Sequence, residues 1–136
     1  MSGRAEFEPI PHTPLLHRVN YPVIEVKDRK ISVRLDDADE KEIELTFQPY
    51  QALKLTTIDC YLSPQGQKYS HNQMLYVRTS EWIEELKSAL RVIDKSANFM
   101  DKAVHFIIPA GDDVLEIAAW KVEIKYQNQQ MTYPDV

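Results

Sequence analysis

The chain has 136 residues, of which 43% are hydrophobic and 27% charged, so it suits one domain and is too apolar to be disordered. No stretch approaches the roughly 18 consecutive apolar residues of a membrane span. A single cysteine excludes an intrachain disulfide and a four-cysteine zinc site. We expect no cofactor, because the glycines, Gly3, Gly66 and Gly111, do not cluster into a phosphate-binding loop.

Negative charge is concentrated in one segment of the chain. The net charge is −5, from 16 basic and 21 acidic residues. Residues 36–44 form an acidic turn that carries this whole excess, so the rest of the chain is neutral. Nucleic acids and anionic membranes attract basic surfaces, so we expect neither as a partner. The acidic turn favours a basic protein instead.

Residues 1–22 form a proline-rich segment with four of the eight prolines. Its glutamates and prolines do not fit a secretory signal, so we expect a cytoplasmic protein. The prolines predict an extended arm. Leu15 and Leu16 would anchor this arm on the body of the protein or on a second copy.

Period-two patterns predict several strands after the arm. Apolar and polar residues alternate over 23–27, 31–35 and 43–47, with polar turns between them, which is typical of an antiparallel meander with one buried face. A longer strand is expected over 52–62, with Cys60 buried and unreactive in it. A short strand is expected over 74–77.

One segment predicts a helix, over about residues 80–97. Ser80 or Thr79 would cap it, and its apolar side chains recur at helical spacing. These side chains are Trp82, Ile83, Leu86, Ala89, Leu90 and Ile93.

The C-terminal third predicts a hairpin of strands 104–108 and 114–126, with Trp120 packed against Trp82 in the core. Residues 127–136 would be a polar, frayed tail. We therefore expect a single α+β domain over 23–126: a strongly curved antiparallel sheet or partly open barrel of about seven strands, with the one long helix packed on it.

His105 and Glu116 are the candidate catalytic residues. Each is a polar residue within an apolar row, and a turn at 109–112 would place the two strands side by side. If the register brings the side chains together, the carboxylate would orient the imidazole as a general base requires. The alternative is a purely structural pair.

The candidate binding residues lie in two segments. One is the acidic turn and the other is the loop rich in tyrosine that follows the long strand. The residues are Asp36, Asp37, Asp39, Glu40, Tyr61, Tyr69, His71 and Tyr76. We expect no metal, because the acidic turn lacks the glycine and flanking helices of a calcium loop, and the histidine pair His12 and His17 lies on the arm.

Two functions remain open. The first is a non-enzymatic cytosolic interaction protein, which binds a protein partner through the acidic turn, the loop tyrosines or the arm, and which pairs with a second copy through the arm or an edge strand. The second is a small-ligand-binding or hydrolase-like domain that uses the concave face of the sheet with His105 and Glu116. The absence of glycine loops, metal-ligand spacing and an evident activated nucleophile favours the first.

Overall fold

The computed structural model describes residues 6–61 and 72–134 of the chain. Antiparallel strands dominate the described part, which holds one α-helix and two short 3-10 helices, so the predicted α+β class with a curved sheet is confirmed. The elements are β1 (Phe7–Pro9), β2 (Val23–Lys27), β3 (Lys30–Asp36), β4 (Glu42–Thr57), η1 (Ile58–Cys60), β5 (Leu75–Val77), α1 (Glu81–Ile93), η3 (Phe99–Lys102), β6 (Val104–Ala110), β7 (Asp113–Tyr126) and β8 (Gln129–Tyr133).

The predicted meander is confirmed in β2, β3 and the first half of β4. Asp28 and Arg29 join β2 to β3 with φ angles of 53° and 64°, the left-handed pair that a two-residue hairpin turn requires. Ile31, Val33 and Leu35 of β3 are buried, whereas Ser32 between them is partly exposed and Arg34 is exposed. The two-residue period therefore does separate a core face from a solvent face.

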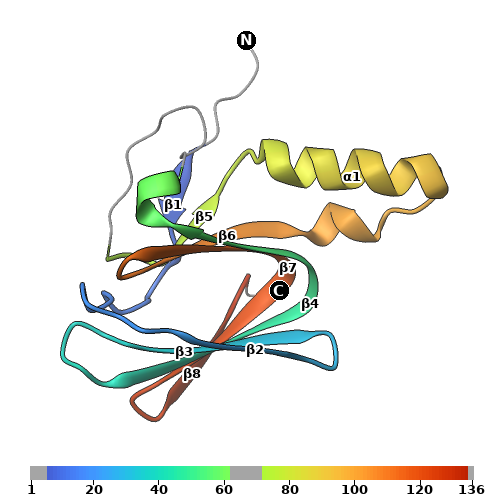
Figure 1. Ribbon diagram of the computed structural model, residues 1–136. Coiled ribbons are helices and arrows are strands. Elements are labelled where there is room, and N and C mark those ends of the chain that lie inside the picture. Colours follow the sequence, from blue (N-terminus) through green and yellow to red (C-terminus); the bar gives the residue numbers. More distant parts are fainter. Residues whose placement is uncertain (1–5, 62–71, 135–136) are drawn as a thin grey trace.

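The curvature of the sheet comes from β4 and β7, which pair along their whole lengths and bend together. The pairing of β4 with β7 shifts by one residue between Tyr50 and Ala52. On β7, the core residues are odd-numbered up to Ala119 and even-numbered from Val122 onward. The first half of β4 pairs with β3, and the second half of β7 pairs with β8. Beyond the bend, β7 pairs with β6, followed by β5 and β1, so one folded sheet provides two facing layers (Figure 1).

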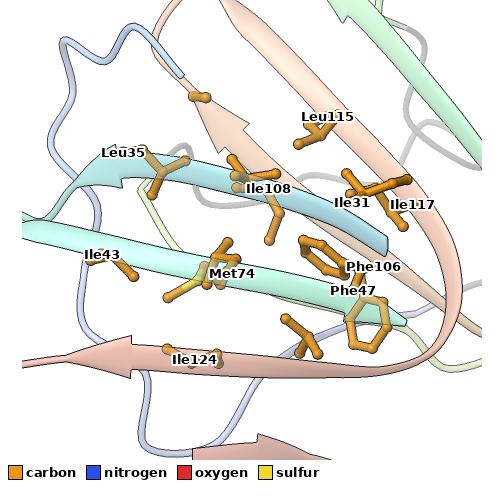
Figure 2. Close-up of a cluster of buried hydrophobic side chains, with 14 of the residues drawn as sticks. Ile31, Leu35, Ile43, Phe47, Met74, Phe106, Ile108, Leu115, Ile117 and Ile124 are labelled. Carbon is orange, nitrogen blue, oxygen red and sulfur yellow. The ribbon is translucent and has the colours of Figure 1, made fainter. Parts of the chain in front are cut away.

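The concave face between these layers is filled by the main hydrophobic core. The rings of Phe47 and Phe106 come from opposite layers, with centroids 5.3 Å apart, and aliphatic side chains surround them (Figure 2). Trp82 and Trp120 are not core residues, contrary to our expectation, because both are partly exposed and neither belongs to the main core cluster. Among the described residues, the concave face is therefore occupied by packed side chains of the core.

Where the structure describes them, the arm and the tail are more ordered than their composition indicates. Residues 129–133 of the tail form β8, so the expectation of a frayed tail is wrong there. In the arm, β1 pairs with β5, and Ile10 and Leu16 are buried in the main core. A Cβ on Gly111, which has a φ of 65°, would meet the backbone oxygen of Asn20 at 2.6 Å, so the arm also packs closely on the β6–β7 turn.

The helix α1 is shorter and less covered than predicted. It begins after the cap Ser80 and ends before Asp94, whose carboxylate accepts hydrogen bonds from Ser96 and so closes a local turn. Only Ile83 of its 13 residues is buried, and its last turns extend beyond the strands (Figure 1). In the described ranges, no helix has the length and apolar character to cross a bilayer.

One further expectation is wrong. Cys60 belongs to the 3-10 helix η1 and is exposed, because β4 ends at Thr57 and the chain turns there.

Candidate functional site

The upper layer of the folded sheet consists of β1, β5, β6, the second half of β4 and the first half of β7, and the remaining strands form the lower layer (Figure 1). His105 and Glu116 meet on the outer face of the upper layer. The register pairs His105 with Ala118 and Ile107 with Glu116, so the two side chains are diagonal neighbours on one face. The imidazole Nε2 lies 2.7 Å from a carboxylate oxygen of Glu116. His105 is 2% exposed and Glu116 is 7% exposed. This face is opposite to the concave one, so a ligand site on the concave face cannot use the pair.

Ser80 completes a chain of three hydrogen-bonded side chains. Its Oγ lies 2.7 Å from Nδ1 of His105, 25 residues away in the sequence. The same Oγ accepts a hydrogen bond of 3.1 Å from the backbone N–H of Ile83 and thereby caps α1. The sequence predicted the cap, but it gave no signal that the cap would also reach the imidazole.

The imidazole is covered on one side and borders a hollow on another. The edge of Trp82 packs on it, with ring centroids 4.9 Å apart, and Nζ of Lys54 lies 4.5 Å from the centroid of the Trp82 ring. His105 and Ser80 also line a hollow of about 310 Å³ whose wall includes Tyr76 and Tyr133. Small molecules can therefore reach the His105–Glu116 pair through the hollow beside Ser80.

The acidic turn divides into one structural residue and three surface residues. Asp37 is 1% exposed, and one oxygen of its carboxylate accepts hydrogen bonds from the backbone N–H groups of Asp39 and Lys41, at 2.9 and 2.8 Å. Burial alone would raise the pKa of Asp37, but these hydrogen bonds, together with one from Tyr126, hold it below the ordinary value. Asp37 is therefore not available to a partner.

The other acidic candidates remain on the surface. Asp36, Asp39 and Glu40 are exposed. Glu40 lies 3.7 Å from the imidazole of His17. These side chains belong to the lower layer, whereas His105 belongs to the upper one, so the two groups of candidate residues form separate sites (Figure 1).

The tyrosine candidates are only partly brought together. Tyr76 packs against Tyr133 with ring centroids 5.1 Å apart, and burial followed by a hydrogen bond to Tyr76 raises the pKa of Tyr133. Tyr61 is half-buried beside the cluster of Leu75 and Val114 on the outer face. Tyr69 and His71 lie outside the described residues.

Exposed apolar side chains on α1 form a surface that the sequence analysis missed. Val92 is 84% and Ile93 87% exposed, although helical spacing predicted that Ile93 faces the sheet. Helical periodicity identifies an apolar stripe, but it does not say whether the body of the same chain covers that stripe.

Comparison with known proteins finds no match among family models, curated proteins or solved structures. Among the described residues, no three histidine, cysteine, aspartate or glutamate side chains lie close enough together to hold a metal ion.

Proposed function

We propose that this protein is a cytoplasmic protein-binding domain that docks its partner through the free apolar side of α1. The observation that carries the proposal is the near-complete exposure of Val92 and Ile93 at the end of a helix with one buried residue. Exposed large apolar side chains gathered on one element are typical of interaction sites.

The spacing of the stripe supports this mode of binding. Trp82, Leu86, Ala89 and Ile93 follow one another by four, three and four residues, the pattern by which an amphipathic helix fills an apolar groove. Trp82 and Leu86 are half-buried, whereas Ala89 and Ile93 are exposed. A short helix is marginal in water without packing of its apolar face, so a groove on a partner would stabilise the last turns of α1.

The charges beside the stripe favour a basic rim on that groove. Glu81 and Glu85 lie one turn apart on the side of α1 next to Val92, and both are exposed. Opposite charges on the partner would steer the encounter and fix its orientation. The exposed acids of the turn at 36–40 would attract the same kind of partner, at a second surface.

The exposed thiol of Cys60 suits the reducing cytoplasm.

The test places a photo-crosslinking phenylalanine derivative at position 92 in the full chain, in cells that make the protein. We expect one discrete adduct, lost when Ile93→Glu is added. The matched control places the same residue at Arg91, an exposed position on the side of the helix away from Ile93. The partner identified from the adduct should bind the purified protein, with affinity lowered at least tenfold by Ile93→Glu and unchanged by Arg91→Ala. Equal adducts at both positions, or no effect of Ile93→Glu, would contradict the proposal.

A further inference from the structure

We propose that Ser80, His105 and Glu116 form an acyl-transfer site that hydrolyses small esters at the hollow beside the first turn of α1. This activity needs neither Val92 nor Ile93, the exposed apolar residues of the docking surface, although Glu81 and Glu85 border both sites. Three side chains from three elements converge here through two hydrogen bonds of 2.7 Å each.

In these hydrogen bonds, the donors and acceptors are arranged in the way that activates a serine. An ionised carboxylate only accepts, so Nε2 of His105 donates to Glu116. The neutral imidazole then presents a lone pair at Nδ1, and the Ser80 hydroxyl donates to it. The two nitrogens are used in the opposite sense to the familiar serine hydrolases, but each residue has the role that the mechanism requires.

The start of α1 stabilises charge on the serine oxygen. The Ile83 N–H donates to Oγ at 3.1 Å, and the helix dipole places partial positive charge at this end. Both interactions strengthen as the hydroxyl loses its proton. A lone cap would not need the buried imidazole and carboxylate behind it, since an apolar pair of similar size packs at least as stably as a buried ionisable pair.

The space around Ser80 sets the substrate class. The hollow of about 310 Å³ has room for a short acyl group. Its lining is part apolar, with Ile83 and Val104, part aromatic, with Tyr76 and Tyr133, and part charged, with Arg78, Glu84 and Lys87. A second, more open hollow of about 420 Å³ borders the other side of Ser80 and is lined by acidic side chains of α1. It leaves room for an uncharged alcohol portion and disfavours an anionic one.

The reaction has two steps and consumes one water. Ser80 Oγ bonds to the acyl carbon as its proton passes to Nδ1 of His105; the ester bond then breaks, and the leaving alcohol takes that proton. Water next adds to the acyl carbon and gives a proton to His105, and Ser80 leaves and recovers the proton. The products are a carboxylic acid and an alcohol. Glu116 is a positioning residue, because it acts only through the imidazole.

The experiment treats the full chain with a fluorophosphonate and maps the modified peptide by mass spectrometry, alongside hydrolysis of p-nitrophenyl butyrate. We expect covalent modification at Ser80. The variant Ser80→Asn should lose both signals yet keep its melting temperature, because asparagine caps a helix as well as serine does. The variant His105→Asn should slow modification on the order of 100-fold or more.

Glu116→Gln separates a positioning role from a structural one. It should slow modification and lower kcat for p-nitrophenyl butyrate with little change in KM, because the carboxylate no longer fixes the orientation of the imidazole. The control Ser96→Ala, at an exposed serine beyond the end of α1, should react as the wild type does. An unmodified Ser80 in the folded wild type overturns the proposal, and so does an equal rate in a folded His105→Asn variant. Neither result bears on the docking surface of α1.

Discussion

At the residue scale, the acidic turn shows that a cluster of charges can hold both surface and structural residues. Four of the five residues at 36–40 are acidic, a composition that by itself predicts that removing the charges leaves stability unchanged. Asp37 is an exception among them because its carboxylate satisfies two backbone donors inside the turn. Backbone groups that are buried without a partner are costly, so this side chain stabilises the turn that joins β3 to β4.

We predict that Asp37→Asn lowers the free energy of unfolding by about 1–3 kcal/mol at neutral pH, because it weakens hydrogen bonds to a buried charge. The control Asp39→Asn, at an exposed neighbour, should stay within about ±0.5 kcal/mol. Urea denaturation of both variants measures this. A neutral effect of Asp37→Asn would mean that the turn does not depend on the carboxylate.

The same carboxylate makes stability depend on pH. Folding lowers the pKa of Asp37 below the ordinary value of 3.8, so its contribution is full above that value and is lost as the pH falls through the lower, folded pKa. We expect the stability difference between wild type and Asp37→Asn to shrink as the pH is lowered from about 5 to 2. Thermal melts across this range test it, and a difference independent of pH would contradict it.

His105 and Glu116 support a second prediction at this scale. Removing one partner leaves a buried polar group without compensation, so Glu116→Ala should cost about 3–5 kcal/mol. Replacing both by apolar residues of similar size, His105→Leu with Glu116→Met, should cost less than the single change. Denaturant titration of the three proteins decides this. If the double variant is the least stable, the pair contributes net stability and a structural reason suffices for it.

At the element scale, α1 shows that an amphipathic helix need not be buried along its whole length. Its first turn is fixed by the Ser80 cap and by Ile83, and its later turns pack only partly on the rest of the chain. An apolar stripe predicted from spacing would make Leu86 and Leu90 full core residues, yet both are half-buried. The helix is therefore held near its N-terminus and open near its C-terminus.

The same substitution at two positions of α1 tests this arrangement. Ile83→Ala should cost about 2–5 kcal/mol, because Ile83 is buried, whereas Ile93→Ala should stay within about ±0.5 kcal/mol, because Ile93 is 87% exposed. Chemical denaturation of the isolated chain gives both values. Equal costs would show that α1 lies flat on the chain and would remove the basis of the docking surface.

At the scale of the whole molecule, the ends of the chain complete the fold. The arm contributes β1 and two core residues, and the tail contributes β8 beside the bent half of β7. The isolated bridge between Leu16 and Asp37 and the hydrogen bonds of Asn20 to Asp36 tie the arm to the start of the acidic turn. The arm is thus part of the core of its own chain.

Neighbouring leucines test the role of the arm. Leu16→Ala should cost about 2–5 kcal/mol, because Leu16 is 1% exposed, whereas Leu15→Ala at a 47% exposed position should cost little. The melting temperature of both variants and of the wild type should not change with a tenfold change in protein concentration. A concentration-dependent midpoint would instead show that the arm is exchanged between two copies.

The local features of this protein can be predicted from its amino-acid sequence alone. Alternation of apolar and polar residues identified the meander from β2 to β4, and cap chemistry with helical spacing identified the start of α1. The two apolar rows of the last hairpin identified His105 and Glu116 as an unusual pair. These features depend on neighbours within a few residues along the chain, so their pattern can be seen without a fold.

Only the tertiary structure decided where those features lie relative to one another. The bend of β4 and β7 shifts the strand register, which turns the concave face into a packed core and leaves His105 on the outer face. Ser80 reaches His105 across 25 residues, and Asp37 is buried because the arm covers it. Such contacts depend on strand register and on which surfaces the rest of the chain covers, and both are set by packing over long separations in sequence.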